Sequence, residues 1–221
     1  MSGIGIFDII GPIMIGPSSS HTAGAIRIGR LARYILGEEP RKAHIFLHGS
    51  FARTFRGHGT DKALVAGLLG LTVDDERVRD ALDLAREKGL EVHWGFKDLG
   101  EVHPNSVELD LSGEQNHVKV LASSIGGGEI LLSRLDGFRI EFSGKLPGLV
   151  AVYPDQRGVV AQVASVLACH EINIATMRVS RERAGGRALM AVETDQEISQ
   201  PARQALLSLP MLEKIAILPR V

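Results

Sequence analysis

The run GPSSSHTAG, at residues 16–24, is the most unusual local feature of the chain. Three serines, a histidine and a threonine stand at the start of a helical pattern. A helix N-terminus presents unpaired backbone N–H groups and a partial positive charge, so it favours a small anion, and hydroxyl groups add further donors. The candidates for such binding are Ser18, Ser19, Ser20 and Thr22. Plain helix capping is the alternative, because serine and threonine are common at helix starts.

A second cluster, GHGTD at residues 57–61, also precedes a helical pattern. His58 lies between two glycines, which allow close approach of the backbone, and imidazole titrates near neutral pH, as proton transfer requires. A histidine in a surface loop is the alternative. Thr60 is expected to cap the following helix. Thr60 and Asp61 are also candidate ligand contacts, although Asp61 would equally complement a helix N-terminus.

Two further candidates lie downstream. Asn105 follows a proline before a predicted strand and offers an amide that can orient a polar ligand, although Pro-Asn is also ordinary turn chemistry. Near the C-terminus, Asp155 and Gly158 connect a predicted strand to a helix, and Asn173 begins the next strand. That helix N-terminus again offers donors, here for an amino-acid effector. A solvated loop is the alternative.

Cysteine usage limits the cofactors that the chain can hold. It contains one cysteine, Cys169. The chain therefore cannot form an intrachain disulfide or assemble a multi-cysteine metal or cluster site from its own residues. A thiolate-held cofactor would have to come from another polypeptide. Cys169 ends an amphipathic helical pattern and is expected to be a small buried hydrophobe.

The bulk composition is that of an ordinary globular protein. The 221 residues are 44% hydrophobic and 23% charged, with a formal net charge of −1. That charge argues against a nucleic acid or an anionic membrane surface as partner. No apolar stretch reaches the roughly 18–20 residues that span a bilayer, and the start lacks the basic region of a signal peptide. We therefore expect a cytoplasmic protein.

The elements that position these residues follow from hydrophobic periodicity. Helices are expected at residues 25–36, 60–70 and 75–88, and a strand at residues 43–48. Short strands with period-two alternation come next, as in half-buried antiparallel strands. These strands are expected at residues 91–96, 106–111, 117–123, 129–132 and 138–142. The first part of the chain, residues 1–145, is thus predicted to be an α+β domain with an antiparallel sheet.

A second domain is predicted at residues 148–221, after a short linker-like stretch. Its pattern is strand, helix, strand, strand, helix, strand, with a turn at Ala184-Gly185-Gly186 between the second and third strands. The strands are expected at residues 149–153, 172–181, 187–194 and 212–218, and the helices at residues 156–169 and 200–207. This βαββαβ order is typical of the ferredoxin-like arrangement.

Two motifs carry a resemblance to a known family. Residues 16–24, with Ile10-Gly11-Pro12 ahead of them, resemble the start of iron–sulfur-dependent bacterial L-serine dehydratases. Residues 49–61, GSFARTFRGHGTD, resemble the second motif of that family, departing at RTFR from the smaller, glycine-containing sequence expected there. Residues 149–221 are similar to an ACT domain. The N-terminal domain is also similar to the allosteric substrate-binding domain of some phosphoglycerate dehydrogenases. The arrangement resembles the separate β subunit of two-subunit enzymes.

The resemblance implies a [4Fe–4S] cluster whose ligands lie on a catalytic α subunit, with no metal ligand on this chain and no pyridoxal phosphate. It implies α,β-elimination of water from L-serine, which yields pyruvate and ammonia. His21 and His58 would face the active site, with the serines of the first motif and Thr22 around the substrate carboxylate. Which histidine is the base stays open. The implied partners are the α subunit, L-serine and a second copy of the chain paired through the ACT domain.

A non-enzymatic function is the alternative. The first motif and the C-terminal domain would then bind serine or another amino acid purely as a sensor that regulates another enzyme.

Overall fold

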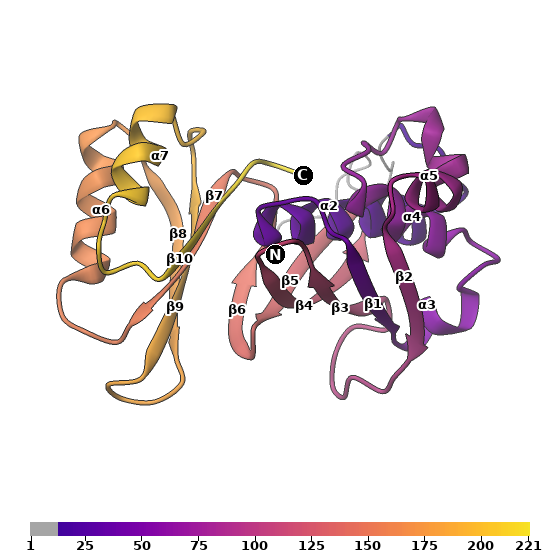
Figure 1. Ribbon diagram of the computed structural model, residues 1–221, viewed down its shortest axis with the longest axis horizontal. Helices are drawn as coiled ribbons and strands as arrows, with labels where there is room; N and C mark the ends of the chain where they lie inside the picture. Colours follow the sequence, from indigo (N-terminus) through magenta and orange to yellow (C-terminus); the bar gives the residue numbers. More distant parts are fainter. Residues whose placement is uncertain (1–12) are drawn as a thin grey trace, which may run out of the picture. The chain divides into compact units, whose positions relative to one another are not determined.

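The computed structural model describes residues 13–221, which form two compact units that divide at Ser133 and Arg134 (Figure 1). Ile10, Gly11 and Pro12 of the first motif lie outside the described residues. Each unit is α+β, as predicted.

The helices of the first unit begin with η1 (Ser19–Gly24), a π-helical turn that runs directly into α2 (Ala25–Leu36). Helix α2 ends at Gly37, whose φ of 79° is the left-handed conformation that commonly closes a helix. Its apolar face is buried, including Ile26, Ile28 and Leu31. The remaining helices are α3 (Gly49–Thr54), α4 (Thr60–Leu68), the 3₁₀ helix η2 (Glu76–Asp80) and α5 (Ala81–Glu87).

The sheet that these helices cover has the order β2-β1-β3-β4-β5-β6. Its strands are β1 (Lys42–Leu47), β2 (Glu91–Phe96), β3 (Ser106–Ser112), β4 (His117–Gly126), β5 (Glu129–Leu135) and β6 (Phe138–Phe142). The division between the units falls within β5. Side chains alternate along β1, where Ala43, Ile45 and Leu47 are fully buried.

The sheet is mixed, whereas the sequence predicted an antiparallel one. Strands β1 and β2 pair in parallel, with Lys42 opposite Glu91 and Leu47 opposite Phe96. The physical reason is the helical connection between them, because α3, α4, η2 and α5 form a crossover that returns the chain to the starting end of the sheet. Strands β1, β3 and β4 pair antiparallel, as expected.

Helices α2 and α4 cross with their backbones in direct contact. A Cβ atom added at Gly29 would lie 2.4 Å from the carbonyl oxygen of Leu64, and one added at Gly67 would lie 2.2 Å from that of Ile26. Any side chain at either position would therefore force the helices apart. Because η1 continues into α2 and His58 immediately precedes α4, this crossing sets the relative position of the two sequence motifs.

Three local predictions for this unit differ from the structure. No element was predicted between the strand ending at residue 48 and the helix beginning at residue 60, but α3 lies there. The helix predicted at residues 75–88 begins instead as the 3₁₀ turn η2, where the Asp75 carboxylate accepts from the Arg77 N–H at 3.0 Å. Thr60 is not a cap, because Gly59 holds the N-cap position of α4 with a φ of 69°, a conformation that favours glycine.

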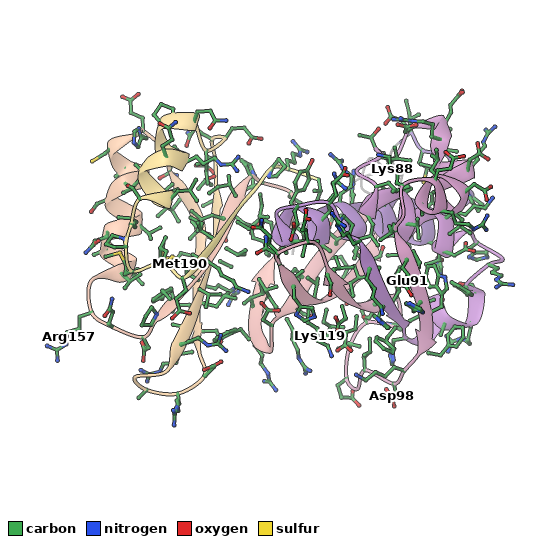
Figure 2. All side chains as sticks on the ribbon, in the orientation of Figure 1. Lys88, Glu91, Asp98, Lys119, Arg157 and Met190 are labelled. Atoms are coloured by element: carbon green, nitrogen blue, oxygen red, sulfur yellow. The ribbon has the colours of Figure 1, made fainter. Side chains whose placement is uncertain are left out.

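Residues 148–221 of the second unit form the predicted βαββαβ arrangement, in the sheet order β10-β7-β9-β8 with antiparallel pairs throughout. Its elements are β7 (Gly148–Pro154), α6 (Val159–Cys169), β8 (Ile174–Arg181), β9 (Arg187–Thr194), α7 (Gln200–Leu207) and β10 (Lys214–Leu218). Both helices pack on one face of the sheet (Figure 1). Met190, labelled in Figure 2, is fully buried in the core between the helices and the sheet.

Cys169 is exposed, so its predicted burial was wrong. Helix α6 buries Val159, Val163 and Leu167, which repeat every four residues along one face. Cys169 lies two residues beyond Leu167 and therefore points away from that face. Within residues 13–221, no helix combines the length and apolar character needed to cross a membrane.

Candidate functional site

His21 lies at the centre of the site, with both ring nitrogens next to hydroxyl groups. Its Nδ1 is 3.3 Å from the Ser18 Oγ, and its Nε2 is 3.3 Å from the Ser50 Oγ. The Ser18 Oγ also accepts from the backbone N–H of His21 at 3.2 Å, so this serine caps η1 as well as contacting the ring. The His21 side chain is nearly buried, with 8% of its surface exposed.

His58, from the second motif, contacts His21 directly. The two ring centroids are 4.8 Å apart and the ring planes are nearly perpendicular, at 87°. His58 is exposed, in contrast to His21. Burial lowers the pKa of His21, and the neighbouring His58 lowers it further. His21 therefore favours its neutral form, while His58 is the imidazole that solvent and small molecules reach.

The segment before α4 holds His58 in place through backbone hydrogen bonds. The His58 N–H donates to the Thr54 carbonyl at 3.1 Å, and the Thr60 N–H donates to the Phe55 carbonyl at 3.1 Å. The Phe55 ring in turn packs against Trp94 of β2, with 4.8 Å between ring centroids. Phe55, which lies in the run where this chain departs from the family motif, thus contacts the sheet.

Asn105 belongs to a loop that reaches the same neighbourhood. The Ser50 N–H donates to the Pro104 carbonyl at 2.7 Å, and the Ser124 N–H of β4 donates to the Asn105 carbonyl at 2.9 Å. The Ser124 side chain lies over η1, because a Cβ at Gly24 would be 2.1 Å from its Oγ. A closed series of contacts therefore links η1, the start of α3, the Asn105 loop and β4.

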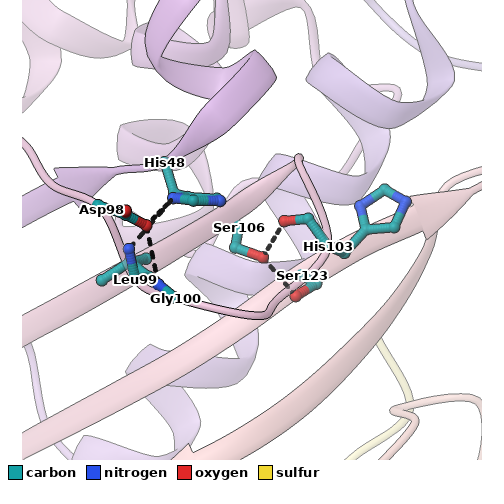
Figure 3. Close-up of polar contacts among 7 residues, drawn as sticks. All are labelled: His48, Asp98, Leu99, Gly100, His103, Ser106 and Ser123. Atoms are coloured by element: carbon teal, nitrogen blue, oxygen red, sulfur yellow. Dashed lines mark hydrogen bonds and ion pairs between the residues drawn. The ribbon is translucent and has the colours of Figure 1, made fainter.

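Two further hydrogen-bonded groups fix the loop around Asn105 (Figure 3). The Ser106 Oγ donates to the His103 carbonyl at 2.5 Å and lies 2.7 Å from the Ser123 Oγ. The His48 Nδ1 accepts from the Leu99 N–H at 3.1 Å. Both groups therefore hold the segment between β2 and β3, to which Asn105 belongs.

Three buried hydroxyl groups around η1 have no hydrogen-bond partner within residues 13–221: the Oγ1 atoms of Thr22 and Thr60 and the Oγ of Ser124. Burying a hydroxyl without a partner costs free energy, so each is a candidate for ordered water or a small polar ligand. Thr22 and Thr60 were predicted from the sequence. Ser124 was missed, because nothing in the local pattern of β4 distinguishes it from a core position.

The structure brings most of the predicted site residues into one region. Ser18 and His21 meet Ser50 and His58 directly. Ser19 and Ser20 are half-buried in the first turn of η1. Asp61, with 7% of its surface exposed, lies in the first turn of α4, where a carboxylate complements the helix dipole. The arrangement offers imidazoles for proton transfer beside hydroxyls and N–H groups for a carboxylate.

The chain is similar to known proteins along most of its length. The family model described as serine dehydratase beta chain matches residues 5–92, and the ACT domain model matches residues 149–210. A Bacillus subtilis (strain 168) protein named probable L-serine dehydratase, beta chain, is 44% identical over 210 residues, which cover 95% of this chain and 96% of that protein. The chain belongs to the serine dehydratase beta chain family.

A second relative supports the same assignment, and a third has the name of a different enzyme. The L-serine dehydratase beta chain of Peptoniphilus asaccharolyticus is 40% identical over 211 residues, which cover 94% of each chain. The D-3-phosphoglycerate dehydrogenase of Bacillus subtilis (strain 168) is 25% identical over 193 residues, which cover 87% of this chain and 37% of that protein. The C-terminal unit of this beta-chain family member is an ACT domain.

The three predicted effector residues do not meet within one ACT domain. The Asp155 carboxylate accepts from the Arg181 guanidinium at 3.2 Å and from the Gly185 N–H at 3.1 Å, so it fastens the turn between β8 and β9. Gly158 is the N-cap of α6, with a φ of 90°. Asn173 lies at the other end of β9, where its amide donates to the Asp195 carboxylate at 2.6 Å.

The residues of this chain do not suffice to hold a [4Fe–4S] cluster, whose ligands the family resemblance assigns to the α subunit. Such a cluster is held by cysteine thiolates, and Cys169 is exposed in the ACT domain. Within residues 13–221, the His, Cys, Asp and Glu side chains form no group of three or more that is arranged to hold a metal ion.

Proposed function

We propose that this chain is the β subunit of an L-serine ammonia-lyase, which eliminates water from L-serine and yields pyruvate and ammonia. The observation that carries the proposal is the direct contact between His21 and His58 beside the hydroxyl-rich start of α2. Two relatives that match this chain along most of its length are named as L-serine dehydratase beta chains.

The residues of the site suit an amino-acid substrate. The N–H groups and hydroxyls around η1 supply donors for a carboxylate, and the helix dipole of α2 favours its negative charge. Elimination also requires removal of the α-proton, and a neutral imidazole can accept one. After water has left, the aminoacrylate becomes an imine, which hydrolyses to pyruvate and ammonia.

The proposal includes an α subunit that carries the [4Fe–4S] cluster, and no pyridoxal phosphate. Its support is the cysteine count of this chain together with the beta-chain names of its relatives. The exposed position of His58 is also suited to a site that a second chain completes.

Co-expression of this chain with a candidate α chain under anaerobic conditions tests the proposal. We expect pyruvate from L-serine with the intact pair and none with either chain alone. His21→Ala and His58→Ala should lower kcat at least a hundredfold, because general acid–base catalysis contributes about 10²–10⁴-fold. His117→Ala, which alters an exposed histidine paired with Asp110 on β3, is the matched control and should keep full activity.

Amino-acid sensing is the second candidate function, because the chain contains an ACT domain. An inactive pair whose cluster is spectroscopically intact, with L-serine still bound by this chain, would favour the sensor.

We also propose that two copies of the chain pair through their ACT domains and bind an effector between them. Strand β8 supports this, because it is an edge strand with Val179 half-exposed. The separation of Asp155 from Asn173 within one domain also suits a site shared between two copies. Val179→Lys should turn a dimer into a monomer in sedimentation measurements, and an unchanged mass would contradict this pairing.

A further inference from the structure

Ser50 is the one hydroxyl residue of the second motif that touches His21. Its Oγ lies 3.3 Å from the His21 Nε2, on the side of the ring opposite the Ser18 Oγ. Hydroxyl groups both donate and accept, so the two serines can satisfy both ring nitrogens in either neutral tautomer. The ring of His21 is thereby held at two points.

The backbone of Ser50 is itself tightly held. Its N–H donates to the Pro104 carbonyl at 2.7 Å, and its carbonyl accepts from the Thr54 hydroxyl at 2.9 Å. Gly49 has a φ of 53°, and a Cβ there would lie 2.6 Å from the Pro104 oxygen, so only glycine fits. The direction of the Ser50 side chain therefore follows from a backbone that is fastened on both sides.

We propose that Ser50 is a positioning residue for the reaction of this site, holding the His21 ring edge-on to His58 through Nε2. The role of Ser50 in the reaction rests on the proposed function. The effect of Ser50 on the orientation of the His21 ring does not, because it concerns this chain alone. Hydrogen bonds to the second nitrogen of a functional histidine set its tautomer and orientation.

Loss of the Ser50 hydroxyl would leave the ring with fewer restraints. The remaining contacts are the Ser18 Oγ at Nδ1, the edge of Phe51 at 5.3 Å between centroids, and His58. Aromatic contacts of this kind restrict the ring plane but do not distinguish Nδ1 from Nε2. The tautomer of His21 therefore becomes the direct readout of the role of Ser50.

The test compares Ser50→Ala with Ser50→Thr, which keeps a hydroxyl, and with Ser133→Ala as the matched control. The Ser133 Oγ on β5 donates to the Leu121 carbonyl of β4 at 3.2 Å. Its substitution therefore removes a hydrogen bond from a hydroxyl group outside the site. Two measurements are made on each variant. One is the histidine ¹⁵N spectrum of the full chain, which reports the His21 tautomer. The other is kcat and KM of the assembled pair with L-serine.

We expect Ser50→Ala to change the His21 tautomer ratio and to lower kcat about tenfold or more, with KM changed less than threefold. Ser50→Thr should restore kcat to within threefold and recover the wild-type spectrum. An unchanged tautomer ratio, or a kcat of Ser50→Ala within threefold of Ser133→Ala, overturns the proposal. If Ser50→Ala does not fold, Ser50→Cys replaces it with the same criteria.

The two proposals can fail separately. A wild-type pair that forms no pyruvate contradicts the proposed function. The histidine spectrum of the full chain then decides the role of Ser50 alone, because it needs no turnover.

Discussion

His21 and His58 meet with their rings nearly perpendicular and their centroids 4.8 Å apart, although they come from separate motifs. One ring is almost buried and the other is exposed. The pair therefore joins an imidazole held in a fixed environment to one that is open to solvent.

The protein should lose stability as the pH falls below about 6.5, and His21 should contribute to that loss. Its pKa is lowered in the folded state from the ordinary value of 6.5, first by burial and then by His58. The unfolded chain therefore binds a proton more readily in this window, so acidification favours unfolding until the folded-state pKa is passed. Urea unfolding of wild type and His21→Gln between pH 5 and 8 measures the contribution. Parallel pH curves for the two proteins would contradict it.

Gly67→Ala should destabilise the first unit and reduce activity together. The added Cβ would lie 2.2 Å from the Ile26 carbonyl oxygen and 2.9 Å from the Gly29 Cα, so α2 and α4 must separate. Overpacking of this kind costs about 1–3 kcal/mol. Denaturant unfolding measures the loss. The control is Gly57→Ala, where the nearest atom to an added Cβ is 3.6 Å away. Equal stability of the two variants would argue against a tight crossing.

Gly24→Ala should be destabilising, and Ser124→Gly should relieve part of the loss. The added Cβ would lie 2.1 Å from the Ser124 Oγ and 2.7 Å from its Cβ, so the two side chains compete for one space. Residues in direct contact show coupling of about 0.5–3 kcal/mol in double-mutant cycles. Unfolding of both single variants and the double variant completes the cycle. Additive effects would show that η1 and β4 pack independently.

Ser143→Ala should weaken the second unit. The Ser143 Oγ donates to the buried Glu193 carboxylate at 2.6 Å, and its N–H donates to the same oxygen at 3.0 Å. A hydrogen bond to a charged group contributes about 1.5–3 kcal/mol. Hydrogen exchange of the β9 amides reports the loss locally. Ser208→Ala removes an exposed hydroxyl bond to the Ala205 carbonyl and is the control. Matching exchange rates in the two variants would contradict the prediction.

Local patterns in the sequence were enough to predict most elements. The strands at residues 91–96, 138–142 and 187–194 and the helices at residues 25–36 and 200–207 match the structure. Such elements depend on periodicity and on the residues at their ends, which are properties of neighbouring positions. Helix α3 was missed because its six residues are too few to show a period.

The candidate site was predictable in its residues but not in its contacts. The sequence alone placed His21 and His58 in two motifs, and one cysteine set a limit on the cofactors of this chain. Only the tertiary structure decided that His21 is buried, that His58 is exposed, and that Ser50 lies between the Asn105 loop and the His21 ring. These relationships depend on how closely α2 and α4 cross and on the crossover that makes β1 and β2 parallel. Both the crossing and the parallel pairing are determined by packing between segments that are distant in the sequence. They cannot be predicted from the order of residues within one segment.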